Sequence, residues 1–309
     1  MFKLSLKNIL SRKGRLVLTA LAVIAGTAFL SGVFVFSDTI KGSFDRMFAS
    51  AYKDTDAIVR SSTVIKGDIG GDTRDHISAD VLDKVRAIPG VKEAVAGINA
   101  SAAITFKGDV VGQDGPPKYG AVWTGSAYSP WSLKEGNPPN GPNEVVIDGA
   151  SAKLAKIKVG DTVTVATFQT TQDFKVVGIA KFAGSDSTGG ASFALFDLGT
   201  AQQFLLGDTT KIDEVYVVGD GAVSQRELAD KVQSALADPM LETRTGAEII
   251  KENQTTVQES LGFLTTFLTI FAVISMFVGS FIIYNVFTIS AAQRARENAL
   301  LRAVGASRS

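Results

Sequence analysis

Histidine and cysteine, on which much enzyme and metal chemistry depends, are almost absent from this sequence. The 309-residue chain has no cysteine and a single histidine, His76. Zinc sites built from histidine and cysteine are therefore excluded. A Ser-His-Asp triad could use only His76, and no Gly-x-Ser-x-Gly turn accompanies it. We predict no catalytic residue, no metal site, no cofactor and no enzyme activity, and we interpret His76 as an exposed surface residue.

Nucleotide and nucleic-acid binding are also disfavoured. The sequence has no Gly-x-x-x-x-Gly-Lys-Ser/Thr loop with which to hold ATP. Its formal net charge is 0, and no basic stretch is interleaved with aromatic residues. The function must therefore be sought in the architecture of the chain.

Two long stretches without a charged residue lie near the ends of the chain, at residues 16–36 and 260–293. As a helix rising about 1.5 Å per residue, the first would be about 32 Å long, enough to cross a hydrocarbon core of about 30 Å. We predict transmembrane helices at residues 16–36 and 263–289. A cleaved signal peptide is the alternative for the first, disfavoured because an h-region usually has only about 7–15 residues. Spans without ionisable residues disfavour a secondary transporter or proton-driven pump.

Basic residues beside each span predict the orientation. Lys3, Lys7 and Arg12 precede the first span, and Arg294 and Arg296 follow the second. Because basic residues concentrate on the cytoplasmic side, both termini are predicted to be cytoplasmic. The acidic-rich segment between the spans is then an extracytoplasmic domain, and the chain is a multi-pass protein of the cell membrane.

Amphipathic helices are predicted next to both spans. Residues 1–15 are predicted to lie on the inner leaflet as a cytoplasmic amphipathic helix. Apolar residues at steps of three and four extend the first span into a stalk helix at 37–52, and a similar stripe at 246–262 leads into the second span. Two such stalks suit a protein that passes motion between the extracytoplasmic domain and the cytoplasm.

The extracytoplasmic domain is predicted to be α+β and to have a split α/β part. Its first piece, residues 53–106, has a strand at 56–60, a helix at 78–88 and a longer strand at 94–106. Its second piece, residues 207–245, has a strand at 214–218, a helix at 224–236 and a strand at 241–244. Ser224 and Glu227 form a capping-box pattern at the second helix. Two such pieces can share one sheet as a ferredoxin-like unit.

Residues 107–206, between these pieces, are predicted to form an inserted β-rich subdomain. Strands are expected at 144–148, 162–168 and 174–180, where apolar residues alternate or run together. The glycine- and serine-rich stretch 184–190 is interpreted as a loop. Without cysteine, the domain must be stable through its own core.

The segment after the second span carries the most specific pattern. It reads Gln-Arg-Ala-Arg-Glu-Asn-Ala-Leu-Leu-Arg-Ala-Val-Gly-Ala-Ser from residue 293. A helix through 293–304 would place Ala299, Leu300 and Ala303 on one face and pair Arg294 with Glu297 at i, i+3. Gly305 would end it. A plain basic helix beside the membrane is the alternative.

This tail resembles the segment that follows the second span in permeases of the MacB/FtsX type, the partners of ABC ATPases. Asn-Ile-Leu-Ser-Arg-Lys-Gly-Arg-Leu from residue 8 is similar to their N-terminal helix. Leu-Lys-Glu-Gly-Asn-Pro-Pro from 133, Glu-Val-Val-Ile-Asp from 144, Val-Gly-Asp-Thr-Val-Thr-Val from 159 and Phe-Lys-Val-Val-Gly-Ile from 174 are similar to their periplasmic core domain. Such permeases ordinarily have further spans after the tail, so the resemblance implies the N-terminal portion of a longer permease.

The resemblance implies that residues 290–309 form a cytoplasmic coupling helix in a groove of a cytoplasmic ABC ATPase. The implied coupling residues are Gln293, Arg294, Arg296, Glu297, Leu300, Leu301, Arg302, Ala303 and Gly305. The other implied partners are a second permease copy, in a homodimer or a pseudo-dimer, and membrane lipid. The implied work is mechanical, on a lipid, lipoprotein or drug-like substrate. The alternative function is a two-pass receptor with an extracytoplasmic sensor domain.

Overall fold

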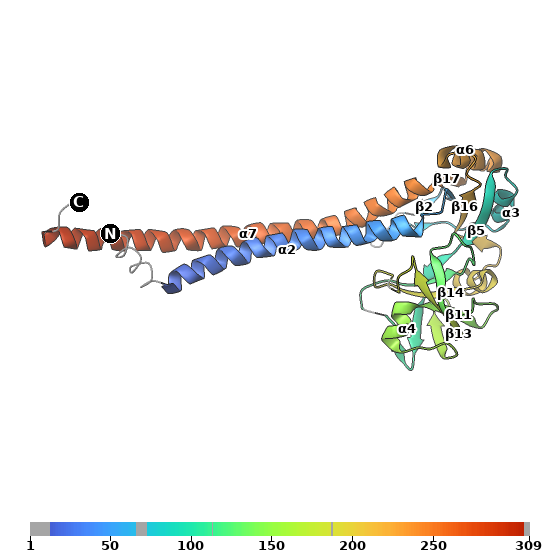
Figure 1. Ribbon diagram of the computed structural model, residues 1–309, viewed down its shortest axis with the longest axis horizontal. Coiled ribbons are helices and arrows are strands. Elements are labelled where there is room, and N and C mark those ends of the chain that lie inside the picture. The colour runs from blue at the N-terminus through green and yellow to red at the C-terminus, as the bar shows by residue number, and fades with distance from the viewer. Residues whose placement is uncertain (1–12, 66–72, 113, 187, 306–309) are drawn as a thin grey trace. The chain divides into compact units, whose positions relative to one another are not determined.

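The computed structural model describes residues 13–65, 73–112, 114–186 and 188–305 and divides into two units (Figure 1). One unit consists of Met1–Gly42 and Val257–Ser309, and the other of Ser43–Thr256. Most of the predicted amphipathic helix at 1–15 lies outside the described residues.

Two long helices, α2 (Lys13–Ala51) and α7 (Gly246–Ala303), form the first unit and continue into the second. In the described part of the chain, Ile24–Ala51 and Gly246–Leu300 are the stretches long and apolar enough to cross a membrane, by length and composition. Each predicted stalk lies in the same unbroken helix as its span. Neither helix is therefore interrupted at the predicted boundaries between stalk, span and tail.

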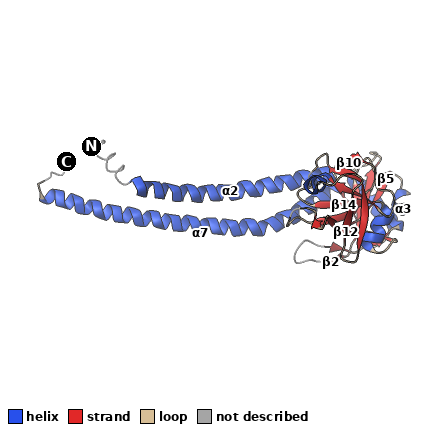
Figure 2. Ribbon diagram, turned by 90° about the horizontal axis from the view of Figure 1, so that it is seen from below, coloured by secondary structure: helices blue, strands red, loops and turns tan. Residues whose placement is uncertain are grey.

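The two helices run side by side (Figure 2) and touch through small and aromatic residues. Ser37 and Thr265 join their hydroxyl groups by a hydrogen bond of 3.1 Å. The rings of Phe29 and Phe271 meet edge to face with centroids 5.8 Å apart. Ala272 is almost fully buried in this contact face. Small side chains let membrane helices approach closely, so this face suits a helix pair within a bilayer.

The domain between these helices, residues 53–245, is called the central domain below. Its smaller sheet is antiparallel, with the order β17-β1-β16-β5. The elements are β1 (Ala57–Ser61), α3 (Asp80–Arg86), β5 (Val91–Gly97), β16 (Glu214–Gly219), α6 (Gln225–Leu236) and β17 (Leu241–Thr245). Taken in chain order, the strands lie fourth, first, third, second, the arrangement of a split βαβ unit. The capping box of Ser224 and Glu227 at α6 is confirmed.

The larger sheet has nine strands within the described residues, in the order β6-β9-β14-β11-β13-β12-β7-β8, with β10 also on β13. The strands are β6 (Asn99–Ser101), β7 (Ala103–Phe106), β8 (Asp109–Val110), β9 (Lys118–Val122), β10 (Trp131–Gly136), β11 (Glu144–Asp148), β12 (Thr162–Ala166), β13 (Thr171–Phe182) and β14 (Ser192–Phe196). The helices are α4 (Gly149–Ala155), α5 (Leu198–Thr200) and the π-helix η1 (Ala201–Leu206). Two short ribbons pair β2 (Val64–Ile65) with β3 (Thr73–Arg74) and β4 (Ile77–Ser78) with β15 (Lys211–Ile212).

The prediction of one long strand at 94–106 is wrong. The segment forms the end of β5 in the smaller sheet and then β6 and β7 in the larger one. The chain must break its strand to pass from one sheet to the other. The larger sheet therefore begins at Asn99, before the predicted start of the insert at residue 107. The strand predicted at 144–148 is confirmed, and those at 162–168 and 174–180 are confirmed with shifted ends.

One continuous set of buried side chains joins the two sheets. Val59, Val217 and Leu228 belong to it on the smaller sheet. Phe174, Phe196 and Phe204 form its aromatic centre on the larger sheet, with ring centroids 4.8–5.5 Å apart. The central domain is thus held together by apolar packing.

Candidate functional site

The place where α2 and α7 meet the smaller sheet is the first candidate site. β1 and β17 are neighbouring antiparallel strands, with Ala57 opposite Thr245. β1 follows α2 after a link of a few residues, and β17 leads directly into α7. Each long helix is therefore connected to one of two adjacent strands.

The start of α7 is fixed by its own cap and by a close backbone contact. The hydroxyl of Thr245 accepts from the N–H of Glu248 at 3.1 Å, and the carboxylate of Glu248 accepts from the N–H of Thr245 at 3.0 Å. This capping box satisfies N–H groups that the first turn leaves free. The N–H of Gly246 donates to the carbonyl oxygen of Asp56 at 3.0 Å. A Cβ at Gly246 would overlap the carbonyl oxygen of Thr55, so only glycine fits.

A ring of two arginines and two carboxylates lies beside this junction, and we call it the Arg60 cluster (Arg60, Arg74, Glu242 and Glu252). Nε of Arg60 lies 2.8 Å from Oε1 of Glu242, and its Nη2 lies 2.6 Å from Oε2 of Glu252. Nη1 of Arg74 lies 2.9 Å from Oε1 of Glu242, and its Nη2 lies 3.7 Å from Oε1 of Glu252. The four side chains come from β1, β3, β17 and α7. The cluster therefore ties α7 to the sheet.

Burial makes these ion pairs unlike ordinary surface pairs. The Arg60 side chain is 10% exposed and that of Glu252 is 45% exposed. Burial opposes the charge of Arg60, but hydrogen bonds and charges from Glu252 and Glu242 outweigh it and raise its pKa. Burial likewise opposes the charge of Glu252, and the hydrogen bond and charge of Arg60 still lower its pKa. Each charge keeps one partner when another member of the cluster is removed, so the expected loss is that of hydrogen bonds to a charged group, about 1.5–3 kcal/mol.

An aromatic contact adds the end of α2 to the junction. Tyr52, just after α2, packs on Tyr216 of β16 with ring centroids 6.3 Å apart, and its hydroxyl accepts from Nδ2 of Asn253 in α7 at 3.4 Å. The hydroxyl of Tyr216 donates to Glu214 at 2.6 Å. Burial raises the pKa of Tyr52, Tyr216 and Glu214. Both helix ends are therefore packed against the smaller sheet.

The tail is the second candidate site, and its predicted residues from Gln293 to Ala303 lie on α7, with Gly305 just beyond the end of the helix. α7 runs without a break to Ala303, and Gly305 has a positive φ of 100°. Leu300 is 62% exposed and Val304 is 89% exposed. At about 100° per residue, both lie on the same face of the helix as Glu297. An exposed apolar patch beside charged residues is typical of a contact surface. The coupling roles of these residues remain predictions.

Sequence reasoning missed the Arg60 cluster. Arg60 follows three apolar residues in β1, Ala57–Ser61, and all five residues of this strand are buried. A charged residue beside such an apolar run is rarely buried without a partner, and this was the signal available in the sequence. Its partners lie far along the chain, at Glu242 and Glu252, and only the folded arrangement brings them together. The sequence interpretation of His76 is an exposed surface residue. Its side chain is half exposed, but Nδ1 lies 2.6 Å from Oδ1 of Asp213.

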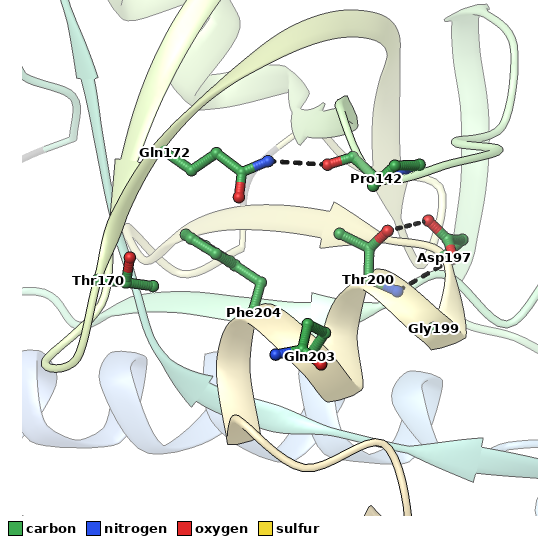
Figure 3. Close-up of a pocket in the computed structure, with 8 residues that line it drawn as sticks. All are labelled: Pro142, Thr170, Gln172, Asp197, Gly199, Thr200, Gln203 and Phe204. Atoms are coloured by element: carbon green, nitrogen blue, oxygen red, sulfur yellow. Dashed lines mark hydrogen bonds between the residues drawn. The ribbon is translucent and has the colours of Figure 1, made fainter.

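A shallow pocket of about 430 Å³ on the larger sheet is a weaker candidate (Figure 3). Thr200 donates both its N–H and its hydroxyl to Asp197, and Gln172 donates to the carbonyl oxygen of Pro142. These polar groups already satisfy one another, so we assign no ligand to the pocket. Within the described residues, no group of three or more His, Cys, Asp or Glu side chains could hold a metal ion.

Comparison with known protein families identifies the class of protein. Residues 16–235 match the model of the MacB-like periplasmic core domain, and residues 269–309 match that of the FtsX-like permease C-terminal domain. The chain therefore belongs to the MacB/FtsX family of ABC transporter permeases, which confirms the resemblance. Proteins of this family are membrane-embedded transport subunits that work with a cytoplasmic ATPase and dimerise. Membership does not favour the receptor alternative.

Solved structures similar to this chain are distant. The periplasmic region of MacB from Actinobacillus actinomycetemcomitans is 11% identical, with 66% of this chain and 94% of that chain covered and a TM-score of 0.47. The extracellular domain of the noncanonic ABC-type transporter YknZ from Gram-positive bacteria is 13% identical, with 60% and 99% covered and a TM-score of 0.42. No curated protein matches the sequence.

Proposed function

We propose that this permease couples ATP hydrolysis by a separate cytoplasmic ATPase to mechanical movement of its central domain. One observation carries the proposal. α7 is a single helix of 58 residues that begins at the junction with the smaller sheet and ends in the exposed tail. At about 1.5 Å per residue it is about 87 Å long, which is more than a bilayer requires. An unbroken helix can transmit a displacement from one end to the other.

The tail is the part of this helix that contacts the ATPase. Leu300 and Val304 supply exposed apolar area, while Arg294, Arg296 and Glu297 supply charges beside it. Gln293, Leu301, Arg302, Ala303 and Gly305 complete the coupling segment. Apolar anchors with a polar rim are the usual composition of a protein interface. ATP hydrolysis is assigned to this separate ATPase.

The orientation follows from the basic flanks of the spans. Both termini lie in the cytoplasm and the central domain lies outside the cell membrane, as a ferredoxin-like unit with a β-rich insert. A second permease copy and membrane lipid are the remaining partners. A lipid, a lipoprotein or a drug-like molecule held outside the membrane is the substrate class that suits such mechanical work.

The coupling assignment is tested by purifying the tagged chain from its own cells in mild detergent and identifying bound proteins by mass spectrometry. The wild type should retain a P-loop ATPase in near-equal amount. The double variant Glu297→Arg/Leu300→Asp should lose it and lose transport-linked ATPase stimulation, while the central domain stays folded. Ala295→Asp is the matched control. It places a charge on the same helix about 140° from Leu300 and should retain the ATPase.

Retention of the ATPase by the double variant would remove the tail from the interface. If no ATPase accompanies the wild type, the proposed function itself is wrong.

A further inference from the structure

We propose that the Arg60 cluster is a latch that holds the base of α7 on the smaller sheet, with Arg60 as its central positioning residue. The inference rests on the proposed function, because a latch matters only if α7 carries motion. It names the contact through which that motion reaches the central domain.

The closed arrangement of charges is the first argument. Each carboxylate of the cluster faces both arginines, and each arginine faces both carboxylates. Arg74 is itself anchored, because its Nη1 also donates to the carbonyl oxygen of Ser61 at 2.7 Å. Glu242 belongs to β17, while Glu252 belongs to α7. The single guanidinium group of Arg60 therefore binds both β17, the last strand in chain order, and α7, the helix that follows it.

The position of Glu252 is the second argument. α7 is already fixed at its first residue through Gly246 and Thr245. A helix held at one point can still pivot there. Glu252 lies almost two turns further along, at about 3.6 residues per turn. Its contact with Arg60, beside the weaker 3.4 Å hydrogen bond of Asn253 to Tyr52, supplies a second point of attachment. Two points define a direction, and the helix can then move the sheet as one body.

An exposed ion pair at the same helix provides a built-in comparison. Arg226 of α6 lies 2.8 Å from Glu248 in the first turn of α7, but its side chain is 68% exposed. Water screens such a pair, and its two charges lose little when separated. The Arg60 cluster, by contrast, holds a guanidinium that is almost buried. Of these two sets of ion pairs, the buried cluster is therefore the one expected to govern the motion of α7.

Hydrogen exchange of the full chain in detergent tests the latch without an ATPase. Glu252→Gln removes one charge at a half-exposed position and should leave the fold intact. Amides of residues 249–256 are expected to exchange about tenfold faster in this variant, because exchange follows the equilibrium for local opening. Arg60→Met should have the same effect or a larger one. Arg226→Met, the matched control, should leave these rates within about twofold of the wild type.

A second readout separates positioning from simple stabilisation. In a complex with the ATPase, Glu252→Gln should still bind the ATPase through its intact tail. It should lose most of the ATP-induced displacement of the central domain. Unchanged exchange in both Glu252→Gln and Arg60→Met would overturn the latch and leave the permease assignment standing. A full displacement in Glu252→Gln would likewise overturn it, whereas failure of the wild type to bind any ATPase would count against the proposed function.

Discussion

Replacing Gly246 by alanine should loosen the junction between α7 and the central domain. The added Cβ would overlap the carbonyl oxygen of Thr55 and lie 3.1 Å from its carbonyl carbon. These are backbone atoms that cannot rotate away, so the start of α7 must retreat by about 1 Å. The 3.0 Å hydrogen bond from Gly246 to Asp56 is then lost. Overpacking of this kind costs about 1–3 kcal/mol, and a hydrogen bond adds about 1 kcal/mol. The higher helix propensity of alanine offsets at most about 1 kcal/mol of this loss in stability.

The unfolding free energy of the central domain is therefore expected to fall by about 1–3 kcal/mol net. This fall can be measured on the central domain alone. The two tryptophans of the chain, Trp123 and Trp131, both belong to this domain. Their fluorescence during urea unfolding in detergent therefore reports on it without interference from the spans. Gly262→Ala in the same helix is the control, since the added Cβ meets nothing within 4 Å beyond the surrounding backbone of its own helix. Equal unfolding midpoints for Gly246→Ala, Gly262→Ala and the wild type would refute the close contact and the reasoning built on it.

Two further predictions use the same fluorescence measurement. Arg60→Met should lower the unfolding free energy of the central domain by about 1.5–3 kcal/mol, because Glu242 and Glu252 lose their hydrogen bonds to Arg60 and keep Arg74 as a partner. Arg226→Met should lower it by less than about 1 kcal/mol. Similar losses in both variants would contradict the buried character of the cluster. Burial raises the pKa of Glu214 in the folded state above its ordinary value of 4.5. The folded domain is therefore most stable, as far as Glu214 is concerned, below pH 4.5, where this side chain is protonated in both the folded and the unfolded states. That stability is lost as the pH rises through the folded-state pKa. Glu214→Gln should therefore stabilise the domain at pH 7 and make no difference near pH 4. A constant difference at both pH values would contradict this assignment.

Local patterns predicted the elements whose signals are contained in a short stretch of sequence. The strand at 144–148 has an apolar centre, residues 145–147, that is buried in the larger sheet, and its position is predicted correctly. The helix starting after Ser224 carries its own capping box, so its beginning was also placed correctly. The segment 94–106 misled the prediction because its apolar residues alternate throughout. Nothing in that alternation shows that the chain leaves one sheet at Gly97 and enters another at Asn99.

The same difference between local and distant contacts separates the two candidate sites. The tail is contiguous, so its residue pattern and its family resemblance were visible in the sequence. The junction depends on pairing between distant residues. Arg60 meets Glu252 only because β1 pairs with β17 and β17 leads into α7. The close approach of Gly246 to Thr55 has no signature other than the glycine itself. Such contacts need the three-dimensional register, which no local pattern specifies.

The central claim is that ATP binding in the partner moves the central domain through α7. The chain has no cysteine, so Ser234→Cys on the exposed face of α6 gives one spin label per copy. The distance between labels on two copies is measured in the ATPase complex, with and without a non-hydrolysable ATP analogue. A clear shift is predicted, together with its loss in Glu252→Gln, which should still bind the ATPase. The same distance distribution in both nucleotide states of the wild-type complex would contradict the account.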